Sequence, residues 1–151
     1  MTDTSNREMI ITRTMNAPRE RVWAAFTDPE HLKHWWGPNG FTNTIYEFDL
    51  RPGGVWKFMM HGPDGKDWPN QITFKEVVPA EKLVYAHGDD TSGDLFNSVL
   101  TLESEGDKTK VTLHVIFPTV EAYTYAKEQV GAIEGGKQNL ERWENYVQHS
   151  L

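Results

Sequence analysis

The 151-residue sequence contains no cysteine. This absence excludes disulfides, thiolate metal sites, iron–sulfur clusters and cysteine nucleophiles. Long apolar runs are also missing. The longest, Val22 to Phe26, spans five residues, whereas a membrane-spanning helix needs about 20. We therefore expect neither a disulfide framework nor insertion into a membrane.

Basic residues are scarce as well. Fifteen Lys and Arg stand against 22 Asp and Glu, which gives a net charge of −7 and a sequence pI near 5.3. Proteins that bind nucleic acid draw most of their affinity from Lys and Arg contacts to phosphate, so we expect no nucleic-acid partner. The N-terminal residues have neither the basic nor the apolar stretch of a signal peptide. Together with the absence of cysteine, this predicts a cytoplasmic protein.

Aromatic residues are abundant: 6 Trp, 5 Tyr and 7 Phe make up 12% of the chain. So many large rings in a small acidic protein must either fill a core or line a pocket. The mass of 17.4 kDa fits one domain. We expect residues 1–7 to form a flexible polar tail and residues 8–151 to form that domain.

Residue patterning predicts an α+β fold. Alternating apolar residues predict strands over 8–15, 42–50, 55–61, 68–78, 82–87, 95–104 and 110–117. Pro18 begins one short helix after the first strand, and Asp28 with Pro29 begins a second that ends near Trp35. These short sequential strands, about seven in number, should form a curved antiparallel sheet wrapped around a long C-terminal helix.

The C-terminal segment changes to helical periodicity. We expect one long helix from Val120 to about Gln148, because apolar residues recur there at helical spacing. The stripe on its inner side comprises Ala126, Val130, Ile133, Lys137, Leu140, Glu144 and Val147. Gly131, Gly135 and Gly136 lie beside the stripe, which indicates that the middle of the helix bends or approaches another element closely.

Six segments in this order resemble the SRPBCC (START-like) superfamily. They are Ala17-Pro-x-x-x-Val-Trp23, His34-Trp-Trp-Gly-Pro38, Asp49-x-Arg-x-Gly-Gly54, Gly62-Pro-Asp-Gly65, Glu76-Val-Val-Pro79 and Glu134-Gly-x-x-x-x-Leu140. Within the superfamily, the chain is similar to bacterial proteins that resemble the C-terminal domain of the heat-shock ATPase activator. The resemblance covers about residues 8 to 149. It implies a helix-grip fold, with a deep pocket between the sheet and the C-terminal helix, but not one particular function.

Strand alternation assigns side chains to this pocket. The predicted ligand-binding set from the strands is Trp56, Phe58, Met60, Ile72, Phe74, Tyr85, His87, Phe96, Ser98 and Leu100. The helix adds Val130, Ile133, Glu134 and Lys137. In the last strand Val111, Leu113, Val115 and Phe117 share the inner face. Apolar walls with a few polar groups are typical of a small-molecule site, although the same residues could simply fill a core.

Three polar members of the set are candidate catalytic residues: Glu134, His87 and Tyr85. A carboxylate in an apolar pocket could act as a general base. Alternatively, Glu134 and Lys137 are three residues apart on the helix and could merely pair with each other. We expect no cofactor, and no metal site, because no third ligand accompanies His31 and His34.

Three functions remain open from the sequence. The first is binding of a small hydrophobic or aromatic molecule, without chemistry. The second is a cyclase, dehydratase or hydrolase that uses the acid–base residues of the pocket. The third is a co-chaperone that acts on a heat-shock ATPase, as the resemblance suggests. A homodimer is also plausible, because Met59, His114 and Ile116 fall on outward faces.

Overall fold

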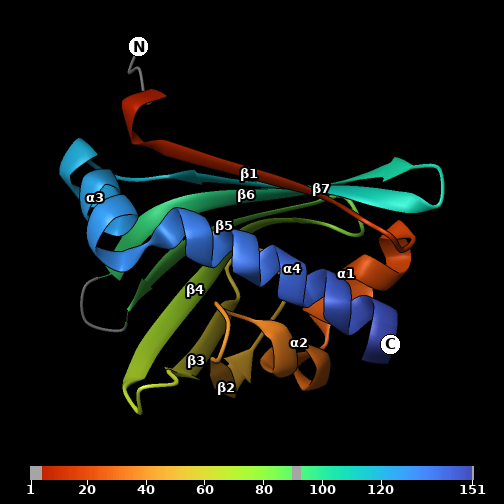
Figure 1. The fold of residues 1–151 in the computed structure, drawn as a ribbon, viewed down its shortest axis with the longest axis horizontal. Helices are drawn as coiled ribbons and strands as arrows, with labels where there is room; N and C mark the ends of the chain where they lie inside the picture. The colour runs from red at the N-terminus through yellow and green to blue at the C-terminus, as the bar shows by residue number, and fades with distance from the viewer. Residues whose placement is uncertain (1–4, 90–92, 151) are drawn as a thin grey trace.

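The computed structural model describes residues 5–89 and 93–150. A seven-stranded antiparallel sheet forms its centre, in the order β1-β7-β6-β5-β4-β3-β2 (Figure 1). The strands are β1 (Glu8–Met15), β2 (Thr42–Phe48), β3 (Val55–His61), β4 (Asp67–Val78), β5 (Lys82–Asp89), β6 (Gly93–Glu105) and β7 (Lys108–Ile116). The predicted strands are all found, with ends that differ by at most two residues. The expected α+β fold is confirmed.

Each strand from β2 to β7 pairs with its neighbour in the chain, and β1 pairs with β7. The strands β1 and β2 are therefore the two edges of the sheet. Alternation along β7 separates its faces as predicted: Val111, Leu113 and Val115 are buried, whereas Thr112 and His114 on the other face are half-buried. One face of the sheet thus supplies its side of the core.

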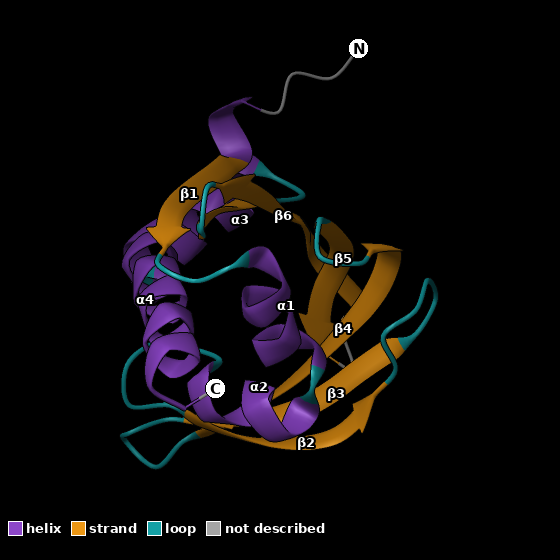
Figure 2. Ribbon diagram, turned by 90° about the vertical axis from the view of Figure 1, so that its right-hand side faces the viewer, coloured by secondary structure: helices purple, strands orange, loops and turns teal. Residues whose placement is uncertain are grey.

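Two short helices, α1 (Arg19–Thr27) and α2 (Pro29–Trp35), lie within the curve of the sheet (Figure 2). Asp28 caps α2 as predicted, because its carboxylate accepts a hydrogen bond from the Glu30 amide at 2.9 Å. Aromatic rings fill the space between these helices and the sheet. Trp35 stacks on Trp143 at 4.8 Å, and Phe26 contacts both rings. The indole N–H of Trp143 donates to the Val22 carbonyl at 3.0 Å.

The C-terminal segment is not one helix, which corrects the prediction for residues 120–148. It consists of α3 (Val120–Tyr125), a short π-helix η2 (Ala126–Val130) and α4 (Ala132–Ser150). The break falls at Gly131, whose φ of 70° lies in the left-handed region. Glycine adopts this conformation at little cost, and it ends the first helical segment there.

The inner stripe of α4 also differs from the predicted one. Leu140, Trp143 and Val147 are buried, whereas Lys137 is exposed. Glu144 is directed to Arg13 on β1, with its carboxylate 2.7 Å from the guanidinium Nε. Residues on one face of a helix recur every three or four positions, so the sequence is compatible with two different inner stripes. In the structure the inner stripe of α4 passes through Gly136 and not through Lys137.

Gly136 explains why a glycine occupies the middle of α4. A Cβ placed on it would lie 2.5 Å from Cδ1 of Ile11 on β1. The missing side chain therefore lets the helix lie against β1, which runs beside it in Figure 1. The close approach expected from the glycines is thus found here, and the bend is found at Gly131.

The first described residues belong to the fold. Ser5–Arg7 form a 3-10 helix, and the Phe117 amide donates to the Arg7 carbonyl at 2.9 Å. The Arg7 guanidinium in turn donates to the Phe117 carbonyl. Of the predicted polar tail over 1–7, residues 5–7 thus contact the end of the sheet, and residues 1–4 lie outside the described residues. No helix in the described part of the chain is long and apolar enough to cross a bilayer.

The turn between β2 and β3 has no room for a side chain at Gly54. A Cβ on Gly54 would lie 2.0 Å from the backbone oxygen of Asp49, which cannot move without breaking the turn. We expect Gly54→Ala to lower the free energy of unfolding by at least about 2 kcal/mol, measured by urea denaturation. The neighbouring Gly53 has a φ of 84° and open space around it. Gly53→Ala should therefore cost only about 1 kcal/mol, and equal losses in the two variants would contradict the steric explanation.

Candidate ligand cavity

A cavity of about 500 Å³ lies between the inner face of the sheet and the helical segment that follows it. The sheet contributes Met9, Tyr85, His87, Phe96, Ser98, Leu113, Val115 and Phe117. The other wall consists of Trp36, Pro118, Ala122, Tyr125, Ala126, Ala132 and Asn139. None of these described lining residues has an acidic, lysine or arginine side chain. The wall is almost entirely apolar.

The cavity lies at the end of the sheet that faces α3 and the start of α4, because the residues that face the sheet there are small. At the other end, Phe26 on α1 and Trp36, directly after α2, pack on Trp56 of β3 and fill the concave face of the sheet with large rings. The segment from α3 to the start of α4 instead presents Ala122, Ala126 and Ala132 to the sheet. Methyl groups do not reach the opposite wall, so space remains between the two layers.

A second hollow of about 190 Å³ adjoins the cavity. The two share Trp36, His87, Ala132 and Asn139, and the second hollow also contacts Met60. Its remaining wall is backbone-rich, formed by Gly37, Pro38, Gly131, Gly135 and Gly136. The shared residues therefore lie where the two spaces meet.

Tyr85 and Ser98 form a buried polar pair on the cavity wall. They are cross-strand partners on β5 and β6, and both are at most 2% exposed. Burial raises the pKa of the Tyr85 phenol, and the hydrogen bond with Ser98 acts in the opposite direction with a smaller effect. Tyr85 is consequently a neutral phenol at pH 7.

His87 is the second polar group on the wall. Its Nε2 lies 2.7 Å from Oδ1 of Asn70, and its ring packs against Phe96 at 4.7 Å between centroids. Burial in these apolar surroundings lowers the pKa of His87 to about 4, because the charged imidazolium would lose its water. At pH 7 the imidazole is neutral.

Asn139 on α4 reaches the cavity beside the loop that carries Trp36. Its Oδ1 accepts a hydrogen bond from the Gly37 amide at 2.9 Å. The Arg142 guanidinium, one turn further along, donates to the carbonyl groups of this same loop. The residues of α4 thus fix the position of Trp36, whose indole forms part of the cavity wall.

The structure brings together only part of the predicted binding set. Tyr85, His87, Phe96 and Ser98 line the cavity, and Met60 lines the adjoining hollow. The buried core, outside the cavity wall, contains Trp56, Phe58, Ile72, Phe74 and Leu100. Ile133 packs half-buried against that core. The side chain of Val130 lies outside those that the structure describes.

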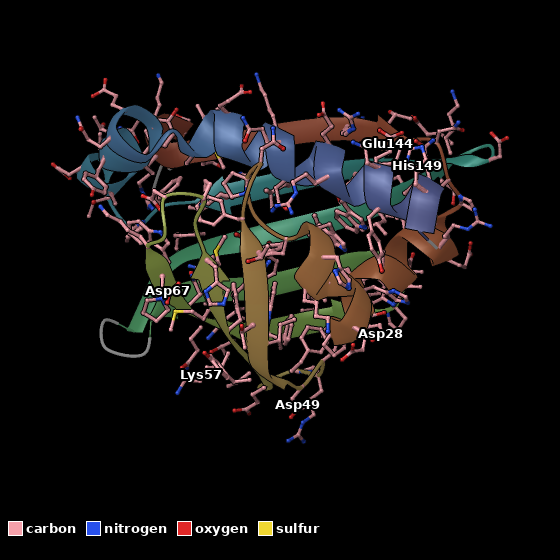
Figure 3. All side chains as sticks on the ribbon, turned by 60° about the horizontal axis from the view of Figure 1, so that its bottom comes forward. Asp28, Asp49, Lys57, Asp67, Glu144 and His149 are labelled. Atoms are coloured by element: carbon pink, nitrogen blue, oxygen red, sulfur yellow. The ribbon has the colours of Figure 1, made fainter. Side chains whose placement is uncertain are left out.

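Glu134 and Lys137 are corrected. Both side chains are exposed and line a separate polar groove between α4 and β1, together with Arg13 and Glu141. The sequence predicts that they face inward because the predicted inner stripe passes through Lys137. In the structure Gly136 faces inward instead. Glu134 therefore does not meet Tyr85 and His87, and the three candidate catalytic residues do not form one site. Other charged side chains, including Asp49, Lys57 and Asp67, lie away from α4 in Figure 3.

Several lining residues were not in the predicted set. Strand alternation assigns Leu113, Val115 and Phe117 to the inner face of the last strand, so it could have identified them as lining residues. Ala122 and Ala126 have no such signal, because small residues are equally common in a packed helix interface. Helical periodicity does not identify Asn139 as a cavity residue either, since a polar residue on a helix is usually solvated.

The lowered pKa of the half-buried His87 makes stability depend on pH. From about pH 6.5 down to about pH 4 the unfolded chain binds a proton at His87 that the folded chain does not bind. Stability should therefore fall as the pH drops through this window, by up to about 3 kcal/mol from this group. Urea denaturation between pH 7 and 4.5 tests this. His87→Gln should flatten the profile, and an unchanged profile would show that His87 is not the group responsible.

Comparisons with known proteins agree with this architecture. Residues 16–148 match the family described as Activator of Hsp90 ATPase homolog 1-like protein. A crystal structure from Mycobacterium smegmatis has 25% identity and a TM-score of 0.88, covering 100% of this chain and 97% of that one. A solution structure from Staphylococcus epidermidis has 26% identity and a TM-score of 0.83, covering 100% and 96%.

A third relative supports the fold alone. It is an AHSA1-like protein from Aeromonas hydrophila with 23% identity and a TM-score of 0.71, covering 93% of this chain and 92% of that one. The comparison with curated proteins gives no match. The similarity to solved structures therefore extends over nearly the whole length of each chain.

Proposed function

This chain belongs to the Activator of Hsp90 ATPase homolog 1-like family, and from that premise we propose that it binds a small apolar molecule in the cavity between the sheet and the segment from α3 to α4. The observation that carries the proposal is the chemistry of the wall. A quarter of the residues in the sequence are charged, yet the described lining residues are uncharged at pH 7, and only Tyr85, His87, Ser98, Asn139 and the exposed Tyr125 carry polar side-chain groups of the hydroxyl, imidazole or amide type.

The size of the cavity supports the same function. Its volume of about 500 Å³ falls in the range of about 300–1,000 Å³ that is typical of small-molecule pockets. A pocket of this size without an occupant forfeits packing contacts along its wall, and an apolar wall gives water few hydrogen-bonding partners. Occupation by an apolar molecule would restore those contacts.

Calorimetric titration with naphthalene tests the proposal directly, because this probe has only apolar surface to offer. We expect saturable binding of one molecule per chain. Thermal denaturation of the same samples should show a rise in Tm that grows with probe concentration. A screen of lipids, phenols and aromatic acids extends the test to larger ligands. If no apolar compound in the screen binds, the proposal fails.

The enzymatic alternative loses its main support, because Glu134 lies outside the cavity. Tyr85 and His87 remain, and both are neutral at pH 7. The co-chaperone alternative rests on the printed description of the family. It is tested by adding the protein to the bacterial heat-shock ATPase. Stimulation of ATP hydrolysis that persists when the cavity is filled by mutation would favour a partner protein over a small ligand.

A further inference from the structure

The polar atoms of the cavity indicate which kind of molecule it holds. Tyr85 and Ser98 hydrogen-bond to each other and are almost fully buried, so each hydroxyl already has a partner within the cavity wall. His87 and Asn139 are different, because each uses one polar atom on the protein and retains a second. Both also line the adjoining hollow, which places them at the shared wall.

The orientation of Asn70 determines what His87 offers. The amide Nδ2 of Asn70 donates to the Trp68 carbonyl at 2.9 Å, so its Oδ1 is the atom that faces His87. An amide oxygen only accepts, and therefore Nε2 of the neutral imidazole carries the hydrogen. The other ring nitrogen, Nδ1, then has a lone pair and acts as an acceptor.

Asn139 offers the complementary group. The Gly37 amide donates to its Oδ1 at 2.9 Å, which identifies the oxygen by its partner. The side-chain Nδ2 retains its two N–H donors. Of the residues that line both hollows, His87 on β5 thus has an acceptor to offer a ligand, and Asn139 on α4 has a donor group.

The charge of the wall limits the ligand in a second way. The described lining residues include no Lys or Arg, and His87 is neutral at pH 7. A carboxylate or phosphate in this cavity would lose its water without gaining a cation, which is strongly unfavourable. An ammonium group would likewise meet no carboxylate among them.

We propose that the cavity selects uncharged ligands that carry a hydroxyl group, which donates to Nδ1 of His87 and accepts from Nδ2 of Asn139. This inference rests on the proposed function and specifies its substrate class: alcohols and phenols with an apolar body. A hydroxyl is the smallest neutral group that donates and accepts at one atom, and it satisfies both sides of the wall.

Isothermal titration with three matched probes tests the proposal: 2-naphthol, naphthalene and 2-naphthoate, at pH 7. The probes share one apolar body and differ in their polar group. We expect 2-naphthol to bind about tenfold more tightly than naphthalene, because two hydrogen bonds are gained. We expect 2-naphthoate to bind at least about tenfold more weakly than 2-naphthol.

Two variants locate the selectivity. His87→Phe removes the acceptor and Asn139→Leu removes the donor, and each should bring the affinity ratio of 2-naphthol to naphthalene close to one. Asn139→Leu also removes the bond to Gly37. The matched control is Gln138→Leu, which removes the neighbouring bond to the Asn39 amide at 3.0 Å but does not line the cavity. That variant should keep the full ratio.

The readout separates the possible failures. A variant that merely disturbs the cavity weakens both neutral probes together and leaves their ratio unchanged, which would overturn the roles of His87 and Asn139. Equal affinity of the wild type for 2-naphthol and naphthalene, or tight binding of 2-naphthoate, overturns the proposed ligand class while the binding function stands. If none of the three probes binds, the inference is overturned, and the wider screen decides whether the binding function fails with it.

Discussion

Replacing Arg142 by methionine should lower the free energy of unfolding by about 3 kcal/mol or more. The guanidinium nitrogen Nη1 donates to the carbonyl groups of Gly37 at 2.9 Å and Pro38 at 2.7 Å, with Trp36 further away at 3.3 Å. Nη2 donates to His34 at 3.1 Å and Phe41 at 2.9 Å. Methionine keeps much of the side-chain length but donates no hydrogen bond. The carbonyl groups of His34, Gly37 and Phe41 then lose the Arg142 donor, whereas those of Pro38 and Trp36 still accept from the Phe41 amide and the Asn43 side chain.

The geometry of the guanidinium makes this site specific for arginine. Its planar fork directs donors from two nitrogens at separate carbonyl groups, whereas a lysine ammonium is a single point with three donors. Arg142→Lys should therefore recover only part of the loss. Arg142 is half-buried, and this loss of water lowers the pKa of its guanidinium.

Urea denaturation at pH 7 measures the effect. The matched control is Arg51→Met, because Arg51 is exposed and pairs with the neighbouring Asp49 at 2.7 Å. An exposed pair of this kind contributes about 0–1 kcal/mol. If Arg142→Met costs no more than Arg51→Met, then α4 does not hold the loop in the way described.

The second large effect is on binding. Leu113→Trp should weaken naphthalene binding about a hundredfold, because the larger side chain projects from the inner face of β7 into the cavity. The cavity has room for an indole, so the protein should remain folded. Ile116→Trp is the matched control, since Ile116 lies on the same strand but on the opposite face. That variant should bind naphthalene as the wild type does.

Calorimetry gives the affinities, and thermal denaturation without ligand gives the stabilities. The predicted pattern is lost binding with retained stability for Leu113→Trp, and no change in binding for Ile116→Trp. Unchanged affinity in Leu113→Trp would place the probe somewhere other than this cavity. A large drop in stability would mean that the space cannot accept a side chain and is not open in solution.

Most of the fold can be predicted from the sequence, because it depends on patterns that extend over a few neighbouring residues. Strand alternation and the cap at Asp28 each act over a few residues, so each can be recognised without knowing the tertiary structure. The C-terminal helix shows where such rules stop. Glycine is compatible with both a helix interior and a left-handed end, and only the packing of α4 on β1 distinguishes Gly131 from Gly136.

The cavity is harder to predict for a related reason. Alternation identifies which strand residues face inward, and it correctly directs Phe58 and Tyr85 to the same side of the sheet. It does not indicate how far away the opposite wall is. Phe58 packs against Trp36, directly after α2, and joins the core, whereas Tyr85 lines the cavity together with the small residues of α3 and η2. That distance is set by tertiary packing.

The alanine methyl groups offer the most direct test that the cavity binds a small apolar molecule. Ala122, Ala126 and Ala132 line the cavity, whereas Ala25 and Ala86 are buried and do not line it. Carbon-13 labelling of alanine methyls and titration with 2-naphthol should shift the resonances of the first three and leave the other two nearly unchanged. No shift at saturating probe, or shifts confined to Ala25 and Ala86, would contradict the proposed site.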